Sequence, residues 1–110
     1  MEYSEDEEYQ RSAIGRFYYA CFGVARDYYE KRKNKKLSGD KPHKTLIKSF
    51  EDSYYEDEEK IGRKLRKLRS YRNYSDYGKQ FRKNNVIKSK KISQELFSMF
   101  DDLSKNNRYD

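Results

Sequence analysis

The chain has 110 residues, enough for one domain, and its 26 Lys and Arg against 19 Asp and Glu give a formal net charge of +7. Hydrophobic residues make up only 34%, but 12 Tyr and 6 Phe supply large side chains that bury much area. The composition therefore predicts a single folded domain over residues 1–110 with a thin, tyrosine-rich core. Its one Cys excludes an intrachain disulfide or a Cys-based zinc cluster, and we expect no metal and no cofactor.

The same composition bears on assembly and location. A core this thin often gains its missing burial from a second subunit, so we expect a symmetric homodimer. The first residues are acidic, which is not typical of a signal peptide, and no apolar run reaches the length of a membrane span. We therefore expect a cytoplasmic protein with no membrane segment.

Two helices are predicted in the first half of the chain. Ser4 and Glu7 have the spacing of a capping box, and helical periodicity continues from there to about Lys33. Residues 34–41 are polar and break the period, and Pro42 then suits the first turn of a second helix.

Two more helices are predicted in the second half. The third begins near Glu58 and ends at Gly78, with residues 54–59 forming either a loop or its first turn. A polar turn is predicted at residues 83–85, before the fourth helix, and residues 105–110 are expected to fray.

Apolar residues that recur at steps of three and four predict the core face of each helix. They are Ile14, Tyr18, Cys21, Ala25, Tyr28, Leu46, Ile47, Phe50, Ile61, Leu65, Leu68, Ile92, Leu96, Phe100 and Leu103. Helices of this kind with short connections predict an all-α, up-and-down bundle.

Positive charge is concentrated between Lys60 and Lys91, where 13 Lys and Arg face a single Asp. Such a run is typical of a protein that binds a polyanion such as RNA. It is also compatible with a solvated surface that binds nothing, because charge runs alone are poorly specific.

Polar residues interrupt the apolar face of the third helix. Arg72 occupies the position that the preceding period reserves for an aliphatic residue, and a charge there must be paired or face a wet cleft. One interpretation is an ion pair between Arg72 and Asp76, with Asn73 bonding a neighbouring helix and Tyr77 filling core space. The other is that Arg72 and Arg69 bind a phosphate, with Tyr77 as a hydrogen-bond donor or stacking surface.

Three segments resemble, in order, one branch of the HEPN superfamily (higher eukaryotes and prokaryotes nucleotide-binding). Residues 15–22 read Gly-Arg-Phe-Tyr-Tyr-Ala-Cys-Phe and are similar to that branch's Ser-Arg-Ala-Tyr-Tyr-Ala-x-Phe signature. Residues 42–50 begin Pro-His-Lys and resemble its second element, which contains a His-Lys or His-Arg pair. Residues 65–77 resemble its third element, in which Arg-x-x-Ala-Asp-Tyr is common.

The resemblance implies a HEPN-like bundle of four to five helices that dimerises, with the polar end of the third helix lining a shared cleft. Many members are ribonucleases of toxin-antitoxin or defence systems, neutralised by a nucleotidyltransferase. Carried over to this chain, the resemblance makes Arg72, Asn73, Asp76 and Tyr77 candidate catalytic residues, and Arg16, Tyr19, His43, Arg69 and Arg72 candidate RNA-binding residues.

The chain departs from the family's pattern at two positions. The phenylalanine-histidine pair common at the end of the first signature is lost, because Gly23 follows Phe22. In those nucleases a histidine follows the arginine of the third element by a few residues, whereas here that place is taken by Tyr77. Tyrosine titrates near pH 10 and is a poor general base at neutral pH, so cleavage stays open. His43, the only histidine, would have to reach the cleft from another helix, or it is a packed residue. Cys21 is interpreted as a core side chain.

Two functions remain as hypotheses at this point. The first is an RNA-directed protein of a toxin-antitoxin or defence system. The alternative is a non-catalytic helical module that binds a nucleotidyltransferase or a larger defence complex through the acidic segments 2–8 and 51–59. A DNA-binding regulator is disfavoured because the chain has no helix-turn-helix pattern.

Overall fold

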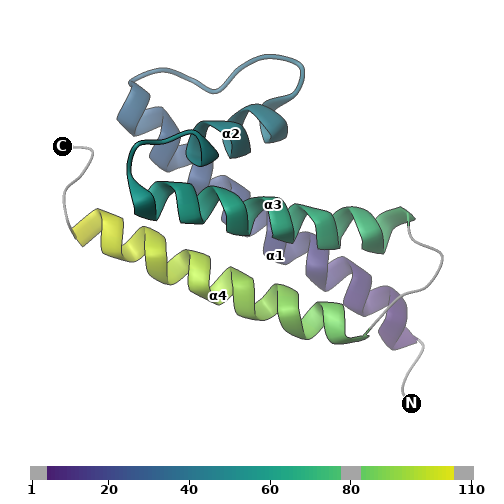
Figure 1. Ribbon diagram of the computed structural model, residues 1–110. Helices are drawn as coiled ribbons and strands as arrows, with labels where there is room; N and C mark the ends of the chain where they lie inside the picture. Colours follow the sequence, from purple (N-terminus) through teal and green to yellow (C-terminus); the bar gives the residue numbers. More distant parts are fainter. Residues whose placement is uncertain (1–4, 78–82, 106–110) are drawn as a thin grey trace.

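The computed structural model describes residues 5–77 and 83–105, with side chains for Tyr9 and for residues 11–73 and 84–105. Four helices form it: α1 (Glu5–Lys33), α2 (Pro42–Glu51), α3 (Glu56–Tyr77) and α4 (Lys83–Lys105) (Figure 1). The described ranges contain no strand, so the all-α prediction is confirmed.

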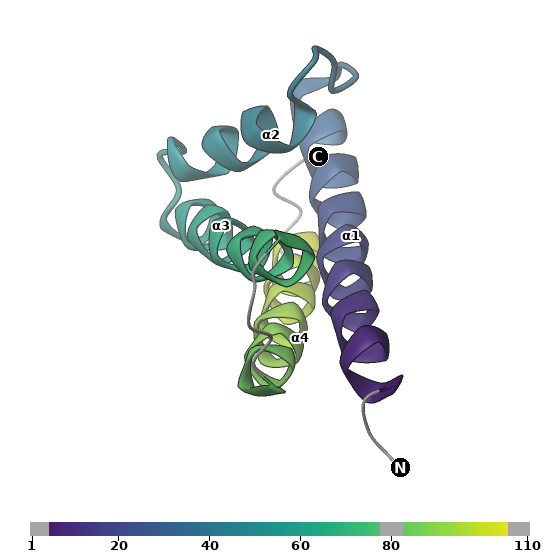
Figure 2. The same ribbon diagram turned by 90° about the vertical axis from the view of Figure 1, so that its right-hand side faces the viewer.

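The three long helices form the body of the molecule. α1, α3 and α4 each contact the other two. The shorter α2 packs mainly on α3, also touches α1, and makes no contact with α4 within the described ranges. Figure 2 shows α2 beside α3, on the side away from α4, after the loop that leaves α1.

The break between α1 and α2 occurs where the sequence predicts it. Asn34 adopts φ of 54°, a left-handed conformation that asparagine tolerates better than most residues. The Lys35 N–H then donates to the Glu30 carbonyl oxygen at 3.2 Å, and the Leu37 N–H donates to the Glu30 carboxylate at 2.8 Å. These bonds turn the chain away from the helix axis. Pro42 then stands in the first turn of α2, as predicted.

Other boundaries differ from prediction or fall outside the description. α3 begins at Glu56, so of the two alternatives for residues 54–59 the first turn of the helix is confirmed; the carboxylates of this turn suit its unpaired N–H groups. The predicted turn at residues 83–85 is wrong, since these residues form the first turn of α4. Polar side chains suit an exposed first turn as well as a loop. The Ser4–Glu7 capping box, the cap at Gly78 and the tail beyond Lys105 lie outside the described residues.

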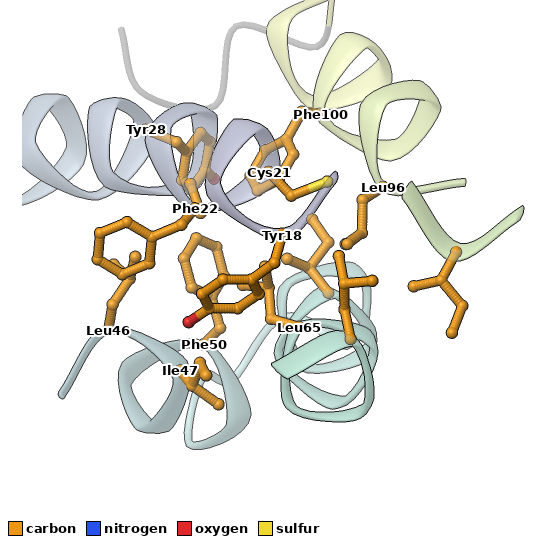
Figure 3. Packing of buried hydrophobic residues seen from close by; sticks show 14 of the residues in the cluster. Tyr18, Cys21, Phe22, Tyr28, Leu46, Ile47, Phe50, Leu65, Leu96 and Phe100 are labelled. Carbon is orange, nitrogen blue, oxygen red and sulfur yellow. The ribbon is translucent and has the colours of Figure 1, made fainter. Parts of the chain in front are cut away.

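The core matches the predicted apolar faces. Every apolar residue predicted for the core is buried, from Ile14 on α1 to Leu103 on α4. Figure 3 shows side chains of the core cluster meeting between the helices, with the Tyr18 ring extending from α1 toward α2. The aromatic rings of Tyr28, Phe50 and Phe100 pack against one another with centroids 5.8 to 5.9 Å apart. Tyrosine therefore contributes to the core, as the composition predicts.

Gly62 permits the close approach of α2 and α3. A Cβ at this position would lie 2.6 Å from the backbone nitrogen of Glu51 and 2.9 Å from the Cβ of Phe50. Real Cβ atoms do not approach backbone so closely. Glycine at position 62 therefore sets the distance between the two helices.

A buried carboxylate joins the start of α3 to the end of α1. Glu58 is only 4% exposed and accepts hydrogen bonds from the Tyr28 hydroxyl and, at 2.6 Å, from the Ser53 hydroxyl. The Arg32 Nε lies 3.3 Å from the same carboxylate. A buried charge is tolerated only when it is paired and hydrogen-bonded in this way.

No helix in the described ranges combines the length and the apolar character needed to cross a membrane.

Candidate functional site

Residues from the three segments that resemble the HEPN elements meet at one place, between α1, the start of α2 and the second half of α3. We call this group the His43 cluster. It consists of Tyr18, Tyr19, Phe22, His43, Arg69 and Arg72.

His43 lies at the centre of the cluster. Its ring stacks on Phe22 with centroids 4.0 Å apart and on Tyr18 at 5.5 Å, and it meets the edge of Tyr19 at 5.8 Å. The Tyr18 hydroxyl and the His43 Nδ1 are 2.7 Å apart, a hydrogen bond that links α1 to α2. His43 is therefore a packed residue, and it lies close enough to Arg69 and Arg72 of α3 to be influenced by their charges.

Arg72 covers the aromatic residues of α1. Its guanidinium carbon lies 4.9 Å from the centre of the Tyr19 ring and 5.8 Å from that of Tyr18. Cation–π contacts of this kind hold a guanidinium against an aromatic face. Arg72 also donates a long hydrogen bond of 3.5 Å from Nη1 to the Asn73 side-chain oxygen.

Arg69 lies one turn before Arg72 on α3. It is half-buried, and its Nε is fully buried without a hydrogen-bond partner among the residues that the structure describes. A buried N–H of a charged group that lacks a partner is costly, because it has lost its hydration and gained nothing in return. Arg69 is therefore the donor that most needs an acceptor.

The cluster favours neutral forms of its two central side chains. Burial, together with the positive charges of Arg69 and Arg72, lowers the pKa of His43, so the imidazole is neutral at pH 7. Burial raises the pKa of Tyr18 to about 12, although the two arginines act in the opposite direction.

A small hollow of about 130 Å³ adjoins the cluster between α2 and α3. Lys44 and Ile47 line it from α2, and Arg66, Arg69, Ser70 and Asn73 line it from α3. Arg66 is engaged elsewhere, because it forms two hydrogen bonds of 2.6 and 2.7 Å to the Glu51 carboxylate. The hollow thus has a cationic lining in which Lys44 and Arg69 remain available to an anion.

The remaining predicted residues are not part of the cluster. Arg16 is exposed, and its guanidinium lies over Tyr9, 5.6 Å from the ring centre, one turn before Tyr19 on α1. The side chains of Asp76 and Tyr77 lie outside the described residues. The expected ion pair between Arg72 and Asp76 and the expected role of Tyr77 therefore stay predictions.

Cys21 is a core residue, as interpreted from the sequence. It is fully buried, its sulfur faces the Ser93 carbonyl oxygen at 3.9 Å, and burial raises the pKa of its thiol. A buried thiol of raised pKa is not suited to nucleophilic chemistry.

Sequence reasoning missed three residues of this region. Tyr18 was assigned to the core alone, yet its hydroxyl orients His43. Phe22 provides the stacking surface beneath His43, and Lys44 lines the hollow beside Arg69. The sequence could have indicated the role of Tyr18, because a tyrosine on a core face needs a hydrogen-bond partner for its hydroxyl.

The cluster combines aromatic faces, a neutral imidazole and two guanidinium groups. These are the groups with which proteins stack bases and bind phosphates. Among the residues that the structure describes, no group of His, Cys, Asp and Glu side chains is arranged to bind a metal ion.

Comparison of the chain with protein-family models, with curated proteins and with solved structures finds no match.

Proposed function

We propose that the chain is a HEPN-type protein that binds RNA at the His43 cluster and acts in a toxin-antitoxin or defence system. The observation that carries this proposal is the convergence of Arg69 and Arg72 on the aromatic group formed by Tyr19 and His43. The family resemblance supports it as well, because one or more residues of each of its three segments, such as Tyr19, His43 and Arg72, lie together. The proposal includes the HEPN-like, up-and-down arrangement of the helices.

RNA suits this cluster better than an isolated small anion does. Arg69 and Arg72 supply charge for the backbone phosphates, and Arg66 lies close by on the same helix. Tyr19 is about half exposed, so its ring is accessible to a base. Arginine together with an exposed aromatic ring is the usual combination for single-stranded nucleic acid.

Cleavage does not follow from the geometry of His43. Its Nδ1 is paired with the Tyr18 hydroxyl and its ring stacks on Phe22, so this nitrogen is not free to take a proton from a ribose hydroxyl. We expect binding without rapid cleavage. Incubation of the protein with labelled RNA in the presence of a chelator measures both binding and cleavage. Intact RNA that is retarded in a gel agrees with this expectation. RNA fragments that form with the unsubstituted protein but not with the His43→Gln variant contradict it.

The proposal retains two partners. A homodimer would place the cluster of each subunit in a shared basic cleft, and a nucleotidyltransferase would neutralise the protein. Sedimentation velocity of the purified chain tests the first, since a dimer has twice the mass of the monomer and sediments faster.

The alternative protein-interaction module is less well supported by segment 51–59. Its carboxylates are largely engaged by cations of the same chain. Glu51 pairs with Arg66, Glu59 with Arg63 and Glu56 with Lys60, while Glu58 is buried. Hydrogen bonding from Arg66 also lowers the pKa of the Glu51 carboxyl. Segment 51–59 therefore serves mainly the chain's own helices.

The test of the proposal is RNA binding by Arg72→Ala, measured by fluorescence anisotropy with single-stranded RNA. We expect binding at least about tenfold weaker, because a hydrogen bond to a charged group contributes about 1.5–3 kcal/mol. Arg63→Ala is the matched control. It removes the same charge from α3, but nine residues correspond to about two and a half turns, so Arg63 lies on the opposite side of the helix. Equal affinities of the two variants would overturn the proposal.

A further inference from the structure

A larger hollow lies on the other side of the His43 cluster, between α1, segment 34–41 and the start of α2. Its volume is about 460 Å³. One side of it is lined by residues of α1 that lie one turn apart, namely Tyr19, Phe22, Gly23 and Arg26. The other side is lined by the first residues of α2, Pro42 and His43.

The lining combines flat apolar groups with a cation at the rim. The rings of Phe22 and His43 are stacked, and Tyr19 meets His43 edge-on, so three aromatic groups converge at this hollow. Arg26 is exposed and forms no hydrogen bond or ion pair with the residues that the structure describes. Aromatic walls beside an available guanidinium favour a planar, uncharged group attached to an anion, which is the chemistry of a nucleotide.

The hollow is open because position 23 has no side chain. A Cβ at Gly23 would meet no atom within 4 Å, so a side chain there would enter open space rather than the core. Gly15, eight residues earlier on α1, has equally open surroundings and lines none of the hollows described above. The two glycines therefore form a matched pair for substitution.

We propose that this hollow holds one unstacked base of single-stranded RNA. The inference rests on the proposed function and names its substrate class. Tyr19 connects the two sites, because its ring lines the hollow and also lies 4.9 Å from the Arg72 guanidinium. A base that enters beside Tyr19 brings the phosphate of its own nucleotide toward Arg72. A base paired within a duplex is stacked and cannot enter.

The test compares Gly23→Leu with Gly15→Leu. Binding is measured by anisotropy with a short labelled single-stranded RNA and with a blunt duplex of the same sequence. We expect Gly23→Leu to bind the single strand about tenfold more weakly, because a leucine there occupies the space of the base and one stacked base contributes about that factor. Duplex binding, which uses only phosphate contacts, stays unchanged in Gly23→Leu, and Gly15→Leu binds both RNAs as the unsubstituted protein does.

Circular dichroism establishes that the variants are folded, and Gly23→Gln provides similar bulk should Gly23→Leu not fold. Unchanged single-strand binding by the folded Gly23 variant, with binding lost in Arg72→Ala, would overturn the base site and leave the proposed function standing. Equal losses for single strand and duplex would also overturn the base site. Absence of any RNA binding by the unsubstituted chain would overturn both proposals and favour a protein partner.

Discussion

Tyr18 and Tyr19 are adjacent in sequence but have different surroundings, because each residue of an α-helix is rotated by about 100° from the last. Tyr18 is fully buried and directs its hydroxyl to His43, whereas Tyr19 is about half exposed and lies under Arg72. The first residue orients the imidazole, and the second provides a surface for a ligand. The polar tip of tyrosine thus serves the core and the candidate site at once.

His43 makes stability depend on pH in a defined window. Because its pKa is lowered in the folded protein, the unfolded chain binds a proton more readily between the unfolded value near 6.5 and the lower folded value. Stability therefore falls as pH decreases through this window and levels off below it. We expect thermal unfolding to move to lower temperature between pH 7.5 and 5.5.

In His43→Gln, the amide oxygen accepts from Tyr18 without titrating, so this part of the pH dependence should disappear. The same slope in the variant and in the unsubstituted protein would show that His43 is not held neutral.

Gly62→Ala should destabilise the protein, because the new methyl group would collide with the Glu51 backbone nitrogen and force α2 away from α3. Overpacking of this kind costs about 1–3 kcal/mol. Urea unfolding measures it. Gly15→Ala is the control: it adds a methyl group in open space within α1 and should stabilise by about 0.5–1 kcal/mol. A neutral Gly62→Ala would mean that the two helices are not in such close contact.

At the scale of the helices, much of the fold can be predicted from the sequence. The period of residues such as Ile14, Leu65 and Leu96 indicates three helices and their buried faces, and Pro42 marks the start of a fourth. The contact between Tyr18 and His43 could not be predicted in this way. It depends on how residues 34–41 return the chain, which no periodicity describes. The polar start of α4 was missed because the side chains of an exposed first turn resemble those of a loop.

The junction of α3 with α1 depends on Glu58. In Glu58→Ala, the buried Tyr28 hydroxyl loses its acceptor and Arg32 loses its carboxylate. We expect the free energy of unfolding to fall by about 3 kcal/mol. Chemical denaturation measures this loss, and Glu59→Ala is the control.

Glu59 pairs with the exposed Arg63 within one helix, so its removal should cost less than about 1 kcal/mol. Equal losses in the two variants would contradict the structural role assigned to Glu58.

At the scale of the whole molecule, which has a formal net charge of +7, the basic side chains differ in whether they are paired with carboxylates. The cations near segment 51–59 are paired with its carboxylates, while Arg69 has a buried N–H without a partner in the described ranges. The sequence identifies the basic third helix, but it does not distinguish the arginines that pair with segment 51–59 from those that lie beside the aromatic rings of the His43 cluster.

Salt dependence distinguishes these arginines. Each phosphate neutralised on a single strand contributes about 0.7 to the slope of log affinity against log salt. Arg72→Ala and Arg69→Ala should each reduce the slope by about that amount. Arg63→Ala should leave it unchanged, and a reduction in that variant would show that binding follows net charge rather than the cluster.

The most direct measurement of the central claim is the mapping of RNA contacts by ultraviolet cross-linking, with single-stranded RNA that contains 4-thiouridine, followed by mass spectrometry. If RNA binds where we propose, cross-links will lie on Tyr19, Phe22 or His43, at the meeting of α1 and α2. Cross-links confined to α4, or none at a concentration at which RNA is bound, would contradict the account.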